Sequence, residues 1–176
     1  MAEIDLRSLI RDVPDFPRAG IVFKDVMPLL ADPAALHQAV DALAAWAEPR
    51  RPDVVVGAEA RGFILGAALA YRLGCGFVCA RKPGKLPYLT VGAKYALEYG
   101  FDALEMHVDA LTRGARALIH DDLLATGGTA RAKVELVEQL GAEVVGLAFV
   151  VELSFLNGRD KLYGYDVHSL INYDAA

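Results

Sequence analysis

Two adjacent carboxylates followed by a glycine-rich turn are the residues of this sequence best suited to chemistry. Asp121 and Asp122 end an apolar run that begins at Ala117, and the turn after them contains Thr126, two glycines and Thr129. A segment with helical spacing comes next. Glycines let backbone N–H groups approach an anion closely, and the N-terminus of a helix adds partial positive charge. This order of strand, acids, turn and helix predicts a site for a phosphorylated sugar.

The two acids would repel a phosphate, so we expect them to face sugar hydroxyls or a divalent cation. The competing interpretation is a solvated turn whose glycines only reverse the chain, but such a turn needs no pair of carboxylates. The sequence contains neither the G-x-G-x-x-G fingerprint of dinucleotide sites nor the G-x-x-x-x-G-K-[ST] P-loop. Both absences argue against nicotinamide enzymes and P-loop kinases.

The elements that must position these residues alternate between strands and helices. Such alternation predicts an α/β fold, with a mostly parallel sheet covered by helices on both faces. Ligands of these folds bind outside the carboxyl ends of the strands, where Glu59, Arg61, Arg81 and the turn after Asp122 all fall. The expected strands are residues 53–57, 76–80, 117–122, 143–151 and 167–171, and the expected helices are 33–47, 63–73 and 130–140.

Three further segments are expected outside this alternation. Apolar spacing over residues 3–13 predicts a short N-terminal helix. Residues 83–92, with two prolines and two glycines, indicate a mobile loop, and residues 95–99 and 104–108 alternate like the strands of an antiparallel hairpin. The sequence has no repeat or linker, so we expect a single domain over residues 1–176.

Composition excludes several classes of protein. The formal net charge of −5 argues against binding to nucleic acid. No apolar stretch is long enough to suggest a membrane span, and the N-terminus lacks the pattern of a secretory signal. Cys75 and Cys79 have no metal-binding spacing and indicate reduced thiols in a cytoplasmic protein.

Five sequence blocks resemble one enzyme family, in the same order, between about residue 10 and Tyr173. Leu118–Thr129 resembles the phosphoribosyl pyrophosphate (PRPP) motif of type I phosphoribosyltransferases: an apolar run, two acids, two apolar residues and A-T-G-G-T. Phe16–Leu30 resembles the N-terminal signature of the adenine phosphoribosyltransferase family. Its pyrophosphate loop, flexible loop and acid-bearing segment are similar to Glu59–Phe63, Arg81–Pro87 and Leu97–Gly100. The sequence departs from the family at His120, where an apolar residue is usual, and at residues 88–93.

The resemblance implies a type I phosphoribosyltransferase fold with a flexible loop and hairpin over the active site, and with residues of about 1–30 in the base-binding hood. The implied reaction joins adenine to PRPP and gives AMP and diphosphate, a pentosyl transfer of purine salvage. A cytoplasmic homodimer that uses Mg²⁺ is also implied. Magnesium would be held mainly through PRPP, with Asp121 and Asp122 as candidate ligands.

The resemblance also implies which residues bind each part of the substrates. The ribose and 5′-phosphate would be bound by Asp121, Asp122, Ala125, Thr126, Gly127, Gly128 and Thr129. The pyrophosphate would be bound by Glu59, Ala60, Arg61, Arg81, Lys82 and Lys85. Adenine would be bound by Val22, Phe23, Lys24, Arg61, Leu123 and Ala125, and the catalytic residues would be Glu98, Lys85 and Arg61.

Several of these assignments have ordinary structural alternatives. Glu98, expected to act as a protonated acid beside N7 of adenine, could instead be an exposed strand residue. Phe23 could belong to the core and Lys24 could be solvated. His120 is expected on the strand face opposite Asp121, as a partly buried histidine with satisfied hydrogen bonds, and the alternative is a modulating role near the site. The family's pyrophosphate loop carries a non-proline cis peptide at the place of Glu59 and Ala60, which a sequence cannot show.

Two rival functions remain. A transferase for hypoxanthine, guanine or xanthine would want a donor toward O6, commonly a lysine after the PRPP motif, and Glu98 and the Phe16–Leu30 block argue against it. A PRPP-sensing regulator would have lost catalysis and would carry a DNA-binding region before the transferase domain. The roughly fifteen residues before Phe16 leave no room for that region, and the negative net charge argues the same way.

Overall fold

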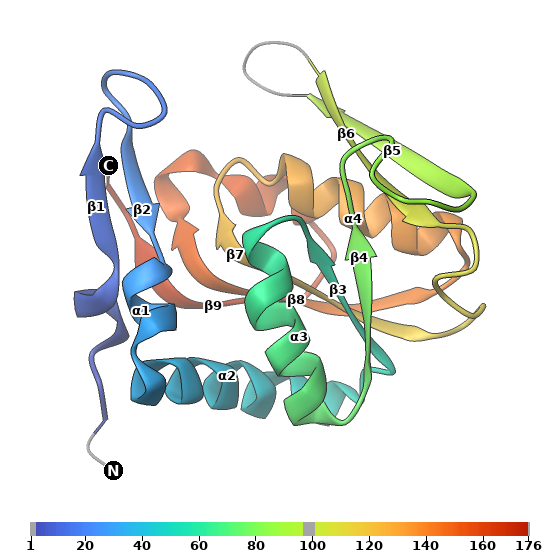
Figure 1. Ribbon diagram of the computed structural model, residues 1–176, viewed down its shortest axis with the longest axis horizontal. Helices are drawn as coiled ribbons and strands as arrows, with labels where there is room; N and C mark the ends of the chain where they lie inside the picture. The colour runs from blue at the N-terminus through green and yellow to red at the C-terminus, as the bar shows by residue number, and fades with distance from the viewer. Residues whose placement is uncertain (1–2, 97–100, 176) are drawn as a thin grey trace.

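A five-stranded sheet forms the centre of the protein (Figure 1). The computed structural model describes residues 3–96 and 101–175. All neighbouring strands of the sheet run parallel, in the order β4-β3-β7-β8-β9, which confirms the predicted parallel sheet. The strands are β3 (Val54–Ala58), β4 (Gly76–Ala80), β7 (Arg116–Leu124), β8 (Glu143–Leu153) and β9 (Val167–Tyr173).

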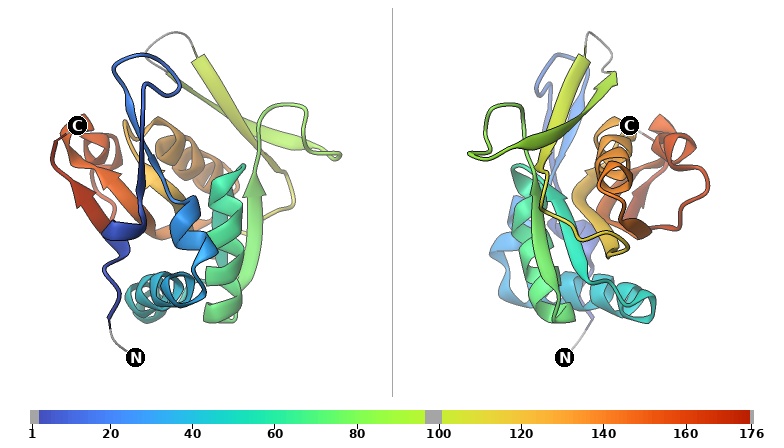
Figure 2. Two further views of the ribbon diagram at one scale, coloured as in Figure 1. Left: turned by 60° about the vertical axis from the view of Figure 1, so that its left-hand side comes forward. Right: turned by 90° about the vertical axis from the view of Figure 1, so that its right-hand side faces the viewer.

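Helices cover both faces of the sheet, as the sequence predicts (Figure 2). α2 (Pro33–Ala47) and α3 (Arg61–Leu73) pack on one face with Val55 and Leu118, whereas α4 (Gly128–Gln139) packs on the other with Val56 and Ile119. Adjacent strand residues point to opposite faces, so β3 and the Ala117–Ile119 part of β7 are apolar at every position and serve both layers. A short helix, α1 (Met27–Ala31), and a 3₁₀ turn, η2 (Glu48–Arg50), flank α2.

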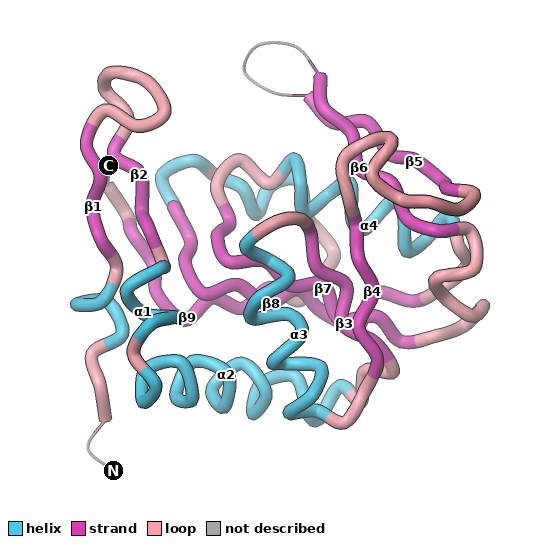
Figure 3. Tube along the Cα trace, in the orientation of Figure 1, coloured by secondary structure: helices cyan, strands magenta, loops and turns pink. Residues whose placement is uncertain are grey.

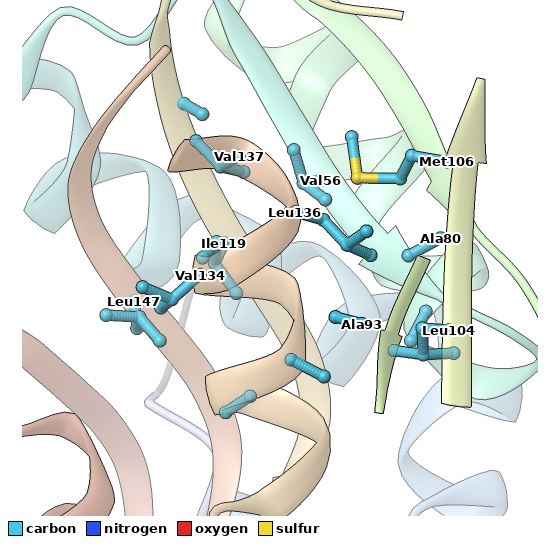
Figure 4. Close-up of a cluster of buried hydrophobic side chains, with 14 of the residues drawn as sticks. Val56, Ala80, Ala93, Leu104, Met106, Ile119, Val134, Leu136, Val137 and Leu147 are labelled. Atoms are coloured by element: carbon cyan, nitrogen blue, oxygen red, sulfur yellow. The ribbon is translucent and has the colours of Figure 1, made fainter. Parts of the chain in front are cut away.

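The core on the α4 face also fixes a hairpin (Figure 4). This hairpin consists of β5 (Thr90–Ala96) and β6 (Phe101–His107), paired antiparallel. Leu104 and Met106 of β6 are buried in the same cluster as Val134 and Leu136 of α4. The hairpin is therefore held beside α4 by apolar packing.

Capping residues explain where the helices begin and end. The Asp32 carboxylate accepts a hydrogen bond of 2.9 Å from the Ala35 amide, and Pro33 occupies the first turn of α2. Gly74 ends α3 in the left-handed region, with φ +69°. Both boundaries agree with the sequence-based expectation.

Other boundaries differ from it. Residues 3–13 do not form one helix: a 3₁₀ turn, η1 (Leu6–Leu9), is followed by β1 (Arg11–Pro14). β1 pairs with β2 (Val22–Asp25), because Pro14 disfavours a helix at the residue before it and the partner strand takes up the backbone groups. The hairpin strand expected to begin at Tyr95 begins at Thr90, and β7 continues through the acids to Leu124.

Both hairpins extend beyond the same edge of the central sheet (Figure 3). This edge is the one at which the parallel strands end.

Among residues 3–96 and 101–175, no helix is long and apolar enough to cross a membrane.

Candidate functional site

A cavity of about 340 Å³ lies at the carboxyl ends of β3, β7 and β8. The structure thus brings together two segments that the sequence predicts for one site, the loop after β3 and the acidic turn after β7. The cavity is lined by Glu59, Ala60, Arg61, Asp121, Asp122, Leu123, Leu124, Ala125, Thr126, Gly127, Gly128, Thr129, Ala130 and Phe149.

The two aspartates of the cavity are each paired with a different cation. Asp121 accepts a hydrogen bond of 2.7 Å from Nζ of Lys133 in α4, and Asp122 is ion-paired with Nε of Arg61 at the start of α3. Asp121 is 9% exposed and Asp122 is 5% exposed. The two ion-pair partners come from different helices, although the two carboxylates also interact with each other and Asp121 lies against Gly62 of α3.

Burial and the neighbouring Asp121 raise the pKa of Asp122 from 3.8 to about 6, against the opposing effect of Arg61. In the unfolded chain Asp122 releases its proton near pH 4. Between pH 4 and about pH 6 the folded chain therefore binds more protons than the unfolded chain. The stabilising contribution is complete below about pH 4 and is lost as the pH rises through about 6.

We expect urea denaturation between pH 4 and pH 7 to show this loss in the wild type and not in Asp122→Asn. Parallel curves for the two proteins would contradict the raised pKa.

The turn after the acids presents its backbone to the cavity. Gly127 lies in the left-handed region, with φ +78°, and precedes α4. Among the residues that the structure describes, no side chain caps this helix end. The amides of Ala125–Thr129 and the Thr126 and Thr129 hydroxyls are therefore suited to bind an anion.

The loop after β3 and the segment after β4 are joined by hydrogen bonds. Glu59 and Ala60 are linked by a cis peptide bond. The Glu59 carboxylate accepts a hydrogen bond of 2.6 Å from the Lys82 amide and one of 3.2 Å from the Arg81 guanidinium. The same guanidinium donates a hydrogen bond of 3.0 Å to the Lys85 carbonyl. Burial alone would raise the pKa of Glu59, but these bonds and the nearby cations lower it. Within the described part of the chain, the buried Nε of Arg81 has no hydrogen-bond partner.

Three of the predicted pyrophosphate and catalytic residues, Arg81, Lys82 and Lys85, do not line the cavity. The Lys82 ammonium binds Asp102 and the Tyr95 hydroxyl of the β5–β6 hairpin. The Lys85 amide donates a hydrogen bond of 3.2 Å to the Lys82 carbonyl, but Lys85 does not line the cavity. Glu98, the predicted acid, lies outside the described residues.

The predicted adenine residues divide into two groups. The Phe23 ring lies 5.0 Å from the Arg61 guanidinium carbon, and Leu123 and Ala125 line the cavity. Val22, next to Phe23 in β2, is 37% exposed. Phe23 does not line the cavity itself, so the β1–β2 hairpin contacts the site through the cavity-lining Arg61.

Lys24 is placed differently from its predicted role at the base. Its ammonium donates 2.7 Å to Asp12 of β1 and lies 4.3 Å above the Tyr173 ring of β9. The side chain is buried and joins the β1–β2 hairpin to the edge strand of the sheet. The sequence could not show this, because Asp12 and Tyr173 come from distant positions in the chain.

Lys133 is a site residue that the sequence prediction missed. It is fully buried in α4, and Nζ donates to Asp121 and, at 2.8 Å, to the His120 carbonyl. A lysine on the apolar stripe with Ala130, Val134 and Val137 was the available signal. Although it follows the acidic turn, its ammonium is occupied by these two acceptors, so it is not a donor toward a base.

His120 lies on the α3 side of β7 beside Gly66, but it is fully buried, not partly buried as expected, and within the described residues neither ring nitrogen has a hydrogen-bond partner. Burial lowers its pKa to about 4, so the ring is neutral near pH 7. A charged role for His120 in the site is therefore not supported.

The carboxylates fit a magnesium ion that is carried by a phosphorylated ligand. Among residues 3–96 and 101–175, no cluster of three or more His, Cys, Asp or Glu could hold a metal ion. Asp121 and Asp122 retain oxygen lone pairs beyond those used by Lys133 and Arg61. Mg²⁺ usually keeps substrate phosphates and water among its ligands, so two carboxylates suffice beside a diphosphate.

Comparison with known proteins agrees with this geometry. Residues 30–172 match the family model described as phosphoribosyl transferase domain. The adenine phosphoribosyltransferase of Thermotoga neapolitana is 57% identical over 97% of this chain and 100% of its own length. The solved adenine phosphoribosyltransferase of Thermoanaerobacter pseudethanolicus has a TM-score of 0.94 and 53% identity, covering 96% of this chain and 98% of that one. The Saccharomyces cerevisiae enzyme, solved with adenine and an imino-altritol bisphosphate, has a TM-score of 0.90 and 41% identity, covering 94% and 96%.

Proposed function

Because the chain belongs to the phosphoribosyltransferase family, and within it to the adenine phosphoribosyltransferases, we propose that it transfers the 5-phosphoribosyl group of PRPP to N9 of adenine. The products are AMP and diphosphate. The observation that carries the proposal is the single cavity in which Asp121 and Asp122 stand beside the uncapped start of α4. A sugar that bears a 5′-phosphate needs both features at this spacing.

The ribose and its phosphate would lie along the acidic turn. Asp121 and Asp122 bind the ribose hydroxyls and stand near the anomeric carbon, which becomes positively charged as diphosphate departs. The amides of Ala125–Thr129 bind the 5′-phosphate. Fixed carboxylates stabilise the developing cation without having to reorganise in the transition state.

Cationic side chains would stabilise the departing diphosphate. Arg61 and Arg81 lie at the ends of β3 and β4, next to the Glu59–Ala60 loop, and Lys85 follows Arg81. Magnesium, bound mainly through PRPP with Asp121 and Asp122 as candidate ligands, supplies further neutralisation of the phosphate oxygens. For Lys82 to contribute, its ammonium must leave Asp102; closure of the 82–92 loop over PRPP would exclude water from the reaction.

Adenine would be held between the N-terminal hairpin and the acidic turn. Phe23 stacks on the base, the backbone of Val22 offers hydrogen bonds, and Arg61, Leu123 and Ala125 complete the pocket. Residues of about 1–30 then form the hood over the base, within a single domain of residues 1–176. Lys24 acts on this pocket only by holding the hairpin through Asp12.

Glu98 is proposed to act as the acid beside N7 of adenine, where a protonated carboxyl offsets the charge change on the ring. We expect Glu98→Ala to lower kcat by about 10²-fold, the lower part of the range for general acid–base catalysis, with little change in PRPP affinity. Steady-state kinetics with each substrate varied in turn would measure both effects. A turnover number equal to that of the wild type would rule out the acid role.

Substrate choice is tested by incubating the purified protein with Mg²⁺, PRPP and one purine base at a time. We expect AMP from adenine and no nucleotide from hypoxanthine, guanine or xanthine. Product from hypoxanthine but not from adenine would support a 6-oxopurine transferase. Binding of PRPP without product from any base would support the sensor.

The location and assembly of the protein follow from the same family membership. We infer a cytoplasmic homodimer, a location supported by the free thiols of Cys75 and Cys79. Nucleic acid and membranes are not expected partners, given the net charge of −5. Light scattering of the purified chain would give twice the monomer mass if the dimer forms.

A further inference from the structure

A second turn lies directly behind the phosphate-binding turn. It comprises η3 (Ser154–Leu156) and η4 (Gly158–Leu162), which follow β8. Gly158 is buried, and a Cβ placed on it would overlap the Ala125 carbonyl oxygen and lie 3.1 Å from the Gly127 nitrogen. A Cβ on Gly127 would in turn overlap the Gly158 carbonyl. The two turns therefore touch backbone to backbone, and the position of Gly158 limits the shape that Ala125–Gly127 can adopt.

The residue after Gly158 is anchored to the sheet. The Arg159 guanidinium donates two hydrogen bonds of 2.7 Å, one to each carboxylate oxygen of Glu152, and a third of 3.0 Å to the Val167 carbonyl. The Ser169 hydroxyl donates 2.5 Å to the same carboxylate. We call Glu152, Arg159 and Ser169 the Glu152 clasp. A bidentate arginine–carboxylate pair fixes orientation as well as distance.

The clasp is also joined to the strand that leads into the phosphate-binding turn. Glu152 of β8 is the register partner of Leu124 of β7, and Leu124 immediately precedes Ala125. Glu152 is 4% exposed, and the bonds from Arg159 lower its pKa. Without the guanidinium, a buried carboxylate would lose its cation and the Gly158 end of η4 would lose its polar attachment to the sheet, leaving the buried Leu162 to hold the other end.

We propose that the Glu152 clasp positions the phosphate-binding turn by holding the backbone of Gly158 against Ala125 and Gly127. This inference rests on the proposed function, because it takes residues 125–129 to bind the 5′-phosphate. Glu152, Arg159 and Ser169 are positioning residues: they act through Gly158, and none of them lines the cavity.

The test compares ligands that differ only in the 5′-phosphate. Affinities for AMP and adenosine are measured by calorimetry for the wild type, Arg159→Met and Arg159→Lys. Arg159→Met is expected to weaken AMP binding and raise KM for PRPP by about tenfold, since small displacements of binding groups have effects of this order or larger. KM for adenine and affinity for adenosine should stay within about twofold. Arg159→Lys keeps the charge but loses the bidentate geometry. Its affinity for AMP and its KM for PRPP should lie between those of the wild type and those of Arg159→Met.

Arg72→Met is the matched control, because it removes the same charge from an exposed pair with Asp41 on α2. This variant should leave the affinities for AMP and adenosine and the KM values for PRPP and adenine unchanged. Ser169→Ala, which removes one bond of the clasp, gives a milder variant with the same selective loss should Arg159→Met fail to fold. A general loss of structure would instead lower the affinity for both ligands together.

The two proposals fail in different ways. A wild type that binds AMP no better than adenosine overturns the proposed function and the clasp with it. A wild type that prefers AMP, with clasp variants that keep the same preference, overturns the clasp alone.

Discussion

Asp122→Asn is expected to lower kcat/KM for PRPP by about 10³-fold, the upper part of the range found when one stabilising group of a transition state is removed. Asparagine has the same shape but carries no charge, so the ribose cation loses one of its two nearby carboxylates. Arg61 loses its ion-pair partner at the same time. Wild-type activity should also decline below about pH 6, where Asp122 takes up a proton, and the variant should lack this acid limb.

Asp41→Asn is the control for this variant, because Asp41 forms an exposed pair with Arg72 away from the cavity. Its kinetics should match those of the wild type. Thermal denaturation of Asp122→Asn in the presence and absence of AMP separates a folding defect from a catalytic one. A variant that folds and retains kcat/KM within about tenfold would contradict the assignment of Asp122 to the developing cation.

The fold could be predicted well from local patterns. β4 begins and ends where the sequence indicates, and α2 begins at the proline after Asp32. Both depend on apolar runs, caps and breakers within a few residues. Residues 3–13 could not be predicted in this way, because β1 exists through its pairing with β2, ten residues further along.

The same distinction between local and distant contacts holds for the site. The acids and the turn after β7 are contiguous in the sequence, and the structure places them around one cavity with Arg61. Side-chain partners could not be predicted, because a long cationic side chain can reach acceptors in several directions. Lys24 binds Asp12, and Lys82 binds Asp102, although both lysines adjoin site residues in the sequence.

Lys133 is the clearest case, and replacing it gives the largest expected loss of stability. Lys133→Met should lower the free energy of unfolding by about 3–5 kcal/mol, the cost of breaking a buried ion pair by removing one partner. Methionine suits the apolar surroundings of α4, so the loss comes from the polar groups that stay behind. These are the Asp121 carboxylate and the His120 carbonyl, both deprived of their donor.

A double-mutant cycle identifies this cause. If the unpaired carboxylate destabilises the variant, then Lys133→Met combined with Asp121→Asn must cost clearly less than the sum of the two single changes, as judged by urea denaturation. Arg131→Met is the matched control on the same helix: its pair with Glu135 is only partly buried, so its loss should cost less than about 0.5 kcal/mol. If Lys133→Met were as mild as Arg131→Met, Asp121 would not depend on Lys133. The ammonium would then have no part in holding the carboxylate that we propose to bind the ribose.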